Sequence, residues 1–372
     1  MAKIGVVGCG YWGAKHVRSL HDLGGDEIVV CDPDLRRLAN LQRKYPGIAA
    51  YERIDEVLES DVKAVIIATP MASHFDLARR CLLADKDVLV EKPLTTSFEH
   101  AVQLVQLAEE RRAVLMVGHT FLYNPAVESV LDLIASGELG EIYYINLSRL
   151  NLGLFQQDSN VLWDLAPHDL SILLYLLGRF PLQISATGAA HLNPRVCDNA
   201  YLDLIFSHGT HAHVHVSWLE PRKVRRATVV GTRKMVVYDD VAATDKVWVY
   251  DKGINLHYQT DEFEDFHLSY RYGNTTILHT PPDEPLQLEQ KHFIGCTKER
   301  RRPKSDGFAG LHVVALLEAA QRSLDYGGQP LEVEPLVDSP DPNLGSGLER
   351  IAQIKTPRWS PANAKTSTSM VP

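Results

Sequence analysis

The sequence of 372 residues predicts an α/β protein with two sheets. One is a doubly wound parallel sheet in the N-terminal part. The other is a large, open, mostly antiparallel sheet in a C-terminal α/β domain. Up to about residue 120, short apolar runs alternate with amphipathic helical stretches, which is typical of a parallel sheet covered by helices on both faces. Beyond Gly118, strand patterns with alternating polar and apolar residues dominate, which favours an antiparallel sheet with one open face.

The first domain is predicted over residues 1–120. Its apolar runs are residues 4–7, 28–31, 64–68, 88–90 and 114–117, and the helical stretches between them include residues 35–45, 74–84 and 98–111. Each run is short enough to be a buried strand. Each stretch repeats its apolar residues with the period of a helix that buries one face.

The second domain is predicted over residues 121–334. Helices are expected over 125–136, from about Pro167, and over 286–300 and 308–326; strands are expected over 142–150, 201–206, 211–218, 226–230, 235–238 and 247–250. Residues 335–372 are rich in Pro, Ser, Asn and Thr and show no sustained period, so we expect a disordered tail there.

Charge and composition limit the partners of this protein. A formal net charge of −9 argues against nucleic acid or an anionic membrane as the main partner. The chain holds two basic clusters, at residues 222–226 and 300–304. By default they are solvated faces or helix ends, and the alternative is that they bind a phosphate-bearing substrate.

Cysteine usage and the start of the chain predict a soluble, cytoplasmic protein. The five cysteines are widely spread and contain no Cys-x-x-Cys pair, which indicates reduced thiols and neither a disulfide framework nor a zinc site. The N-terminus leads directly into the first strand, so no signal peptide is expected. No apolar run approaches membrane-spanning length.

A glycine-rich turn follows the first strand and opens the first helix. Gly8 permits a tight turn, Gly10 lets the backbone approach a pyrophosphate, and Gly13 lets the helix pack closely on the strand. The backbone N–H groups around Tyr11 and Trp12 are expected to face the phosphates at the helix N-terminus. This arrangement predicts a dinucleotide-binding Rossmann domain.

Asp32 ends the second strand, 19 residues beyond Gly13. Its carboxylate is suited to accept hydrogen bonds from both ribose hydroxyls and to repel a 2′-phosphate, which favours NAD over NADP. Arg36 and Arg37 keep NADP open, since either guanidinium could approach a 2′-phosphate. The alternative for Asp32 is a helix N-cap before Pro33.

Further candidates lie at the carboxyl edge of the first sheet, where ligands of such sheets bind. Thr69 and His74 belong to the segment after residues 64–68, and Glu91 and Lys92 come directly after another buried strand. We expect all four to contribute to the cofactor site. For the first segment, the alternative is a plain turn with a helix N-cap at Ser73.

These features, in this order, resemble the Gfo/Idh/MocA family, named for glucose–fructose oxidoreductase, inositol dehydrogenase and a rhizopine-catabolism protein. The resemblance spans roughly residues 3–334. It rests on the glycine motif of residues 8–13, the turn with Thr69 and His74, Glu91-Lys92-Pro93, Asp164 with His168, and the late stretches 289–293 and 303–307. It implies a Rossmann domain and a second domain whose open sheet forms subunit contacts, hence a homodimer or homotetramer. It also implies a substrate held between the domains.

The resemblance assigns catalytic roles to Lys92, Asp164 and His168 in the oxidation or reduction of a secondary alcohol on a sugar, sugar nucleotide or cyclitol. The residue types suit that chemistry. A neutral imidazole at His168 is the natural base for a hydroxyl proton, and Lys92 could stabilise negative charge on the same oxygen. Asp164 could orient His168 or the substrate hydroxyls, or it could serve the start of the helix near Pro167.

Two positions depart from common family patterns, and both concern substrate contacts. Met71 stands where many members carry a polar residue, and Leu122 stands where an arginine is frequent. Elsewhere, His211, His213 and His215 alternate along one predicted strand and share a face. We interpret these histidines as sheet-face or subunit-contact residues, and no metal site is expected.

The leading hypothesis is therefore an NAD-dependent dehydrogenase acting on a ring alcohol, with sugar nucleotides as the first candidates because residues 222–226 could hold a diphosphate. A glycoside hydrolase or lyase that uses tightly bound NAD transiently would need the same residues. A non-catalytic NAD-binding regulator would not need both Lys92 and His168.

Overall fold

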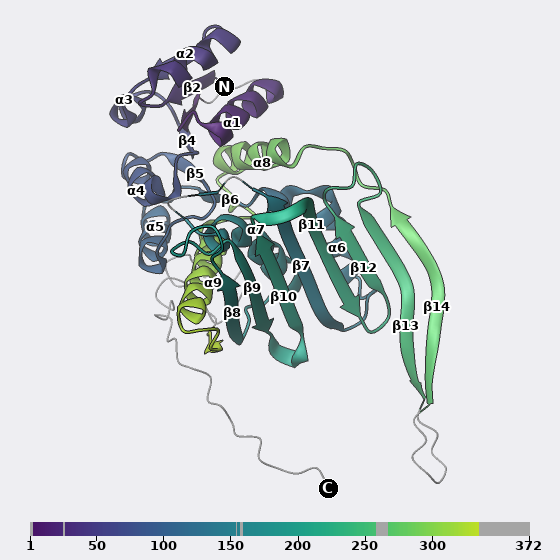
Figure 1. Ribbon diagram of the computed structural model, residues 1–372. Helices are drawn as coiled ribbons and strands as arrows, with labels where there is room; N and C mark the ends of the chain where they lie inside the picture. Colours follow the sequence, from purple (N-terminus) through teal and green to yellow (C-terminus); the bar gives the residue numbers. More distant parts are fainter. Residues whose placement is uncertain (1–2, 25–26, 154, 157–158, 258–266, 335–372) are drawn as a thin grey trace.

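The computed structural model describes residues 3–24, 27–153, 155–156, 159–257 and 267–334. In this part of the chain the protein has two sheets, and the predicted fold class is confirmed. Figure 1 shows the first sheet and its helices at one end of the molecule, with the second, larger sheet beside them. The tail predicted over 335–372 lies outside the described residues.

The first sheet has six parallel strands in the order β3-β2-β1-β4-β5-β6, the order of a doubly wound dinucleotide-binding sheet. Its strands are β1 (Lys3–Val7), β2 (Glu27–Cys31), β3 (Ala49–Tyr51), β4 (Ala64–Ile67), β5 (Asp87–Glu91) and β6 (Leu115–Gly118). The helices are α1 (Tyr11–Leu23), α2 (Leu35–Lys44), α3 (Ile54–Glu59), α4 (His74–Leu83) and α5 (Phe98–Arg111), with a 3₁₀ turn η1 (Met71–Ser73). The short elements β3 and α3 have no counterpart in the sequence prediction, because three and six residues are too few to show a period.

The second sheet has nine strands in the order β14-β13-β12-β11-β7-β10-β9-β8-β15. Among the described strands of this sheet, only β7 and β10 pair in parallel. The strands are β7 (Ile142–Leu152), β8 (Gln183–Ala189), β9 (Asn199–Ile205), β10 (His211–Ser217), β11 (Leu219–Gly231), β12 (Met235–Asp239), β13 (Val247–His257), β14 (His267–Leu278) and β15 (Leu331–Glu332). The remaining elements are α6 (Pro125–Ala135), α7 (Val161–Leu177), α8 (Pro285–Glu299) and α9 (Gly307–Asp325), with 3₁₀ turns η2 (Thr120–Tyr123) and η3 (Ser207–Gly209).

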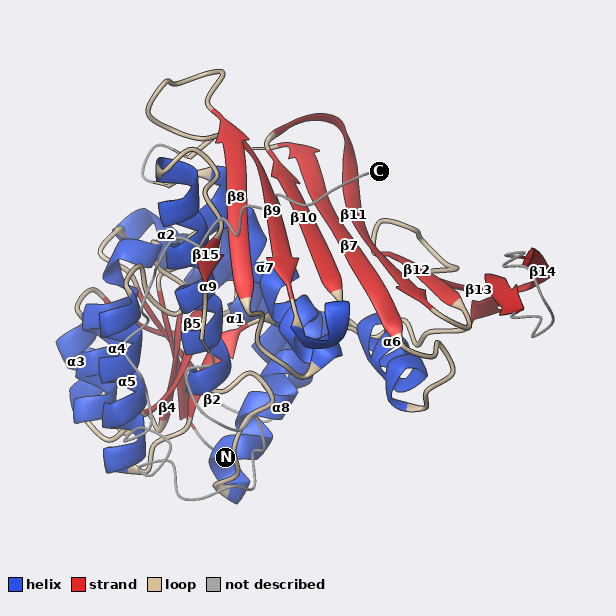
Figure 2. Cartoon of the chain, turned by 90° about the horizontal axis from the view of Figure 1, so that it is seen from below, coloured by secondary structure: helices blue, strands red, loops and turns tan. Residues whose placement is uncertain are grey.

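Helices α6, α7 and α9 pack against one face of this second sheet, and in the described part of the chain no helix covers the other face (Figure 2). The side chains alternate accordingly. On β10, Ala212, Val214 and Val216 are buried under the helices, whereas His211 and His213 are exposed on the open face. The predicted alternation of faces on this strand is therefore confirmed.

Helix α7 begins six residues before the predicted start at Pro167, which lies inside the helix. Asn160 is the N-cap, and its side chain accepts a hydrogen bond of 3.1 Å from the backbone N–H of Trp163. The apolar residues that follow the cap are buried, so packing extends the helix in front of the proline. Asp164 consequently lies in the first turn of α7.

Helix α9 and the residues just before it cover the edge of the first sheet. Just before α9, the backbone of Ser305 accepts a hydrogen bond of 2.8 Å from the N–H of Val117 on β6, and the Ser305 hydroxyl donates to the Val117 carbonyl at 2.7 Å. Phe308 and Leu311 of α9 belong to the apolar core formed with β4, β5, β6, α4 and α5. An edge strand that would otherwise be open is thus protected.

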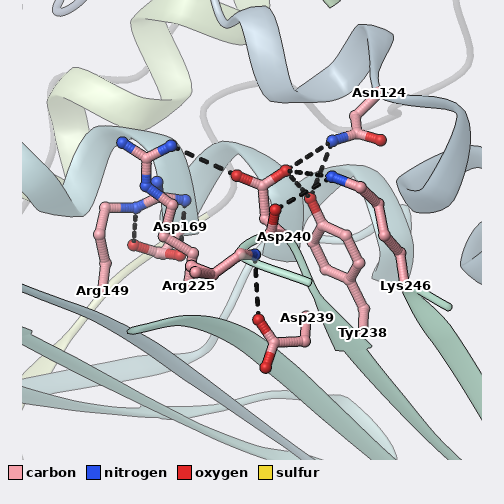
Figure 3. A network of polar contacts seen from close by, with 9 residues as sticks. Asn124, Arg149, Asp169, Arg225, Tyr238, Asp239, Asp240 and Lys246 are labelled. Atoms are coloured by element: carbon pink, nitrogen blue, oxygen red, sulfur yellow. Dashed lines mark hydrogen bonds and ion pairs between the residues drawn. The ribbon is translucent and has the colours of Figure 1, made fainter. Parts of the chain in front are cut away.

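Arg149 of β7 and Asp169 of α7 form a buried ion pair on the helix-covered face of the second sheet (Figure 3). The guanidinium donates through Nε at 2.7 Å and through Nη2 at 3.1 Å, so the carboxylate is bound at both oxygens. The Arg149 guanidinium also lies 4.3 Å from the ring centre of Phe121. Burial raises the pKa of Asp169, although the charge and hydrogen bonds of Arg149 oppose it.

We expect Arg149→Met to lower the free energy of unfolding by about 3–5 kcal/mol, since it leaves Asp169 buried without its partner. Urea unfolding followed by circular dichroism measures this loss. The double variant Arg149→Met with Asp169→Leu is the control, and it should recover most of the lost stability. An Arg149→Met protein as stable as the natural chain would contradict the prediction.

Candidate active site

The glycine turn after β1 has the geometry that a dinucleotide requires. Gly8 has a φ of +88°, and a Cβ atom there would lie 2.7 Å from the carbonyl oxygen of Ala68. A Cβ at Gly13 would lie 1.7 Å from the carbonyl oxygen of Gly8. At Gly10, by contrast, the nearest atom to such a Cβ is Arg37 Nη1 at 3.8 Å. Gly8 and Gly13 are therefore needed by the fold, and Gly10 leaves the turn open to a ligand.

Tyr11 and Trp12 begin α1 directly after this turn, and their side chains are exposed. The ammonium of Lys15 lies 4.3 Å from the centre of the Tyr11 ring and 4.8 Å from that of Trp12. The first turn of α1 contains no acidic residue that could compete with a phosphate for its backbone N–H groups. These residues fit the diphosphate of NAD.

Asp32 lies at the end of β2, beside the glycine turn, and is buried. Its carboxylate accepts hydrogen bonds from the backbone N–H of Cys9 at 2.7 Å and of Asp34 at 2.8 Å. The N-cap of α2 is Asp34, so the capping alternative for Asp32 is wrong. Arg37 Nη1 contacts Asp32 Oδ2 at 3.3 Å, and the arginine side chain is about half exposed.

We expect Asp32→Asn to weaken NAD binding by roughly 30-fold, the equivalent of about 2 kcal/mol for hydrogen bonds to a charged group, and to improve NADP binding. The repulsion of a 2′-phosphate disappears with the charge, while Arg37 remains. Dissociation constants for both dinucleotides, measured by quenching of tryptophan fluorescence, test this. Asp61→Asn is the control, since it removes an exposed charge beside Lys3, at the start of β1, and should leave the cofactor preference unchanged.

His74 connects two turns at the carboxyl edge of the first sheet. Its Nδ1 lies 2.8 Å from the Pro93 carbonyl oxygen and its Nε2 lies 3.0 Å from the Thr69 carbonyl oxygen. Burial lowers the pKa of His74, and the two backbone contacts oppose this shift. The ring is buried, and both of its nitrogens contact backbone carbonyls. His74 therefore holds the two turns of this edge together from the interior of the protein. Thr69 is half-buried there, and its hydroxyl accepts a hydrogen bond of 2.7 Å from Ser73.

Lys92 and Asp164 are in contact, although 72 residues separate them. The ammonium donates to the backbone carbonyl of Asp164 at 2.6 Å and to its Oδ1 at 3.3 Å. The other carboxylate oxygen accepts a hydrogen bond of 3.0 Å from the indole N–H of Trp218. Asp164 thus orients Lys92 in this structure, and Trp218, a buried residue at the end of the predicted strand 211–218, orients Asp164.

His168 follows Asp164 by one turn of α7, so both side chains project from the same face of the helix. Its ring packs edge-on against Phe121, with ring centres 5.1 Å apart. Within the described residues, Nδ1 is buried without a hydrogen-bond partner, which leaves Nε2 on the accessible side of the ring. Burial lowers the pKa of His168 well below its ordinary value, and the positive charges of Lys92, Arg149 and Arg225 lower it further. The imidazole is therefore neutral at physiological pH.

Behind Lys92 lies a set of four buried polar residues, most of which sequence reasoning missed. His16 on α1 contacts Glu91 at 2.9 Å, and Gln290 on α8 contacts His16 at 2.9 Å. His119, next to β6, is wholly buried, and neither of its ring nitrogens has a partner within the described residues. Burial lowers the pKa of His119 to about 4. Only Glu91 of these four residues was predicted to belong to the site.

The two basic clusters differ in their surroundings. In residues 222–226, Arg225 pairs with Asp240 at 3.3 Å (Figure 3). Arg226 pairs with Asp239. Arg222 and Lys223 are exposed in a stretch where the pairing of β11 with β7 shifts register. The cluster at residues 300–304 lies beside Asp87, at the end of β5 opposite Lys92, and its arginines pair with carboxylates there. The second cluster therefore belongs to a different part of the surface from Lys92.

The remaining predicted positions lie outside this group. Leu122 is buried in the apolar core, and Met71 is half-buried in η1. On the open face of the second sheet, His213 contacts Asp203, and His215 stacks on Tyr201 with ring centres 4.0 Å apart. Among the described residues, no helix has the length and apolar character needed to cross a bilayer.

Comparison with known proteins identifies the fold and the chemistry. Residues 2–119 match the family model of the Gfo/Idh/MocA oxidoreductases, described as an NAD-binding Rossmann fold, and residues 127–237 match the model of the family's C-terminal domain. The chain is 30% identical over 319 residues to UDP-N-acetylglucosamine 3-dehydrogenase from Acidithiobacillus ferrooxidans, covering 84% of this chain and 94% of that protein.

Two further matches, one in sequence and one in structure, agree with this family. The scyllo-inositol 2-dehydrogenase (NAD(+)) of Bacillus subtilis is 27% identical over 312 residues, which covers 80% of this chain and 86% of the relative. The solved structure of UDP-N-acetylglucosamine 3-dehydrogenase GnnA from A. ferrooxidans superposes with a TM-score of 0.73 at 25% identity, covering 87% of this chain and 97% of that one. With both domains matched and the glycine turn fitted to a dinucleotide, the chain belongs to the Gfo/Idh/MocA family of NAD-binding oxidoreductases.

Proposed function

We propose that this protein transfers a hydride between NAD and a secondary alcohol or ketone on a sugar, sugar nucleotide or cyclitol, with NADP a poorer cofactor. The observation that carries the proposal is the contact between Lys92 and Asp164, one helical turn before His168. Lys92 is a proton donor and His168 is a proton acceptor. Because both lie next to a turn that fits a dinucleotide, they suit the interconversion of an alcohol and a ketone.

Each residue then has a defined task. When bound, NAD supplies the nicotinamide ring that accepts or returns the hydride. His168, neutral at physiological pH, accepts the hydroxyl proton through Nε2. Lys92 donates a hydrogen bond to the same oxygen and stabilises its developing charge. Asp164, held by Trp218, keeps the ammonium of Lys92 in place.

The substrate class that we favour is a sugar nucleotide, as in a UDP-sugar 3-dehydrogenase. The relative with 30% identity acts on UDP-N-acetylglucosamine. The pKa of Tyr11 is lowered first by Lys15 and further by the positive charges of Lys223 and Arg225. The basic segment at residues 222–226 is therefore close enough to the glycine turn to affect it. Arg222 and Lys223 are exposed at this edge and pair with no carboxylate among the described residues, which suits the diphosphate of a sugar nucleotide.

Absorbance of NADH at its characteristic band tests the proposal directly. Purified protein is mixed with NAD and, separately, with UDP-N-acetylglucosamine, other UDP-sugars, free sugars, and myo- and scyllo-inositol. We expect saturable NADH formation with at least one of these alcohols, and the reverse reaction with the matching ketone. A flat trace with every compound, in protein that binds NAD, would contradict the proposal.

We also propose that the protein is a cytoplasmic homodimer or homotetramer associated through the open face of the second sheet. That face carries exposed aromatic side chains, among them Tyr144 and Tyr201, and large exposed apolar surfaces are usually covered in oligomers. The cysteines form no disulfide in the described residues, which suits a reducing compartment. Sedimentation velocity of the natural chain and of Tyr201→Glu tests the association.

A further inference from the structure

The residue before Lys92 is held by two other parts of the chain. Glu91 is the last residue of β5, and its carboxylate contacts His16 Nε2 on α1 at 2.9 Å. The second carboxylate oxygen accepts a hydrogen bond of 3.2 Å from the backbone N–H of Lys92. His16 and Glu91 are both buried, and 75 residues separate them in the sequence.

Gln290 of α8 determines which nitrogen of His16 carries the proton. Its side-chain N–H₂ group donates to the backbone carbonyl of His16 at 3.1 Å and to His16 Nδ1 at 2.9 Å. Because Nδ1 accepts this hydrogen bond, the proton of the neutral ring is on Nε2. His16 is therefore set to donate to Glu91.

Several charged and titratable groups face Glu91, and their balance keeps it ionised. They are His16 on α1, His74 on α4, His119 after β6, Glu289 on α8, and the adjacent Lys92. Burial alone would raise the pKa of Glu91. The hydrogen bond from His16, together with the charge and the backbone hydrogen bond of Lys92, outweighs burial and brings that pKa below its ordinary value. Of the contributions that oppose burial, the hydrogen bond from His16 is the largest.

We propose that His16 is a positioning residue: held by Gln290, it fixes Glu91 and thereby the backbone of Lys92, and it ties the catalytic lysine to the helix that begins at the glycine turn. The inference rests on the proposed function, since it concerns the reaction that Lys92 serves. It adds a coupling between two halves of the site, because α1 faces the cofactor phosphates at its first turn and reaches Lys92 through its sixth residue.

Kinetics of three variants test the proposal. In His16→Leu, Glu91 loses its donor and Lys92 loses its fixed position. We expect kcat to fall by roughly 10–100-fold, as for a catalytic group that is slightly misplaced, while KM for the alcohol changes little. The acid limb of the pH profile of kcat should move up by about one pH unit, because a buried Glu91 without its hydrogen bond is protonated more easily. His16→Gln keeps an N–H donor and should recover most of the activity. His21→Leu, an exposed histidine on the same helix, is the matched control.

Two results would overturn the proposal: a His16→Leu enzyme with natural kcat and pH profile, or a His16→Gln enzyme as impaired as His16→Leu, which would mean that His16 only fills space. If His16→Leu does not fold, Gln290→Leu takes its place. It frees His16 to carry its proton on Nδ1, and we expect the same upward shift of the acid limb; an unchanged limb would count against the network.

A measurement without substrate separates this inference from the proposed function. The carboxyl ¹³C resonance of Glu91, assigned by its absence in Glu91→Gln, is titrated in the natural chain and in His16→Leu. We expect a pKa below the ordinary glutamate value in the natural chain and above it in the variant. If no alcohol yields NADH but this difference is observed, the proposed function fails and the network stands. Equal titrations in an active enzyme would reject the network alone.

Discussion

Replacing Lys92 by alanine should lower kcat by about 10²–10³-fold, the usual effect of removing one donor to a developing oxyanion. Asp164 contacts the ammonium of Lys92 and the indole of Trp218. Among the described residues in contact with Asp164, only Lys92 is a charged donor that could reach a substrate oxygen. The binding of NAD should remain close to that of the natural chain, because Gly8, Gly10 and Asp32 are untouched. Steady-state kinetics and a fluorescence titration with NAD measure the two effects separately.

Lys63→Ala provides the matched control for this prediction. Lys63 is an exposed lysine just before β4 in the same domain. Its removal should leave both kcat and NAD binding unchanged. Near-normal turnover in Lys92→Ala would mean that another group stabilises the oxygen and that the role given to Lys92 is wrong. A loss of NAD binding as large as the loss of turnover would instead make Lys92 a cofactor residue.

His168→Ala should lower kcat/KM by about 10²–10⁴-fold, the range of general base catalysis. The pH profile gives a more specific test. His168 must be neutral to accept a proton, and its pKa is lowered well below the ordinary value of 6.5, first by burial and then by nearby cations. The natural enzyme should therefore keep its kcat/KM below pH 6.5 and lose it only at lower pH. The variant should lack the part of this limb that protonation of His168 causes, so that only the limb assigned to Glu91 remains.

The charges around His168 allow a check on the cause of that low limb. Arg225 contributes to the lowered pKa and pairs with Asp240 at 3.3 Å. Arg225→Gln should move the acid limb of kcat/KM toward higher pH. His211→Ala, an exposed histidine on the open face of the second sheet, should leave the profile unchanged. An acid limb at or above pH 6.5 in the natural enzyme would contradict the role of His168 as a neutral, buried base.

Much of this fold could be predicted because the signals are local. The strands of the first sheet are continuous apolar runs, and the glycine turn is required by contacts within a few residues, as with Gly13 and the carbonyl of Gly8. The start of α7 was misjudged because Pro167 suggests a first helical residue. The true signal is Asn160 followed by buried apolar residues. The cap at Asn160 is a short local pattern, and it competed with the stronger helix-start signal of Pro167.

The contacts that organise the candidate site could not be predicted. Trp218 and Asp164 are 54 residues apart, and Gln290 and His16 are 274 apart. Nothing in the residues near His16 indicates that it meets Glu91, because a buried histidine on an amphipathic helix is indistinguishable in sequence from one that only packs. Such partners are determined by how the two domains and a late helix pack together. No local pattern in a single sequence indicates that packing.

The covering of β6 by Ser305 and by α9 has a consequence for any attempt to divide this protein. The chain passes from the first sheet to the second part of the protein near residue 120, and we propose that the boundary between the two domains lies there. Yet Phe308 and Leu311 complete the interior of the first sheet, and Ser305 takes up hydrogen bonds along its edge. A protein fragment ending after β6 would expose the unpaired backbone groups of this edge strand and the apolar side chains that α9 otherwise covers. A recombinant cofactor module, or a chimera that exchanges substrate modules between relatives, must therefore bring α9 along with the first 120 residues.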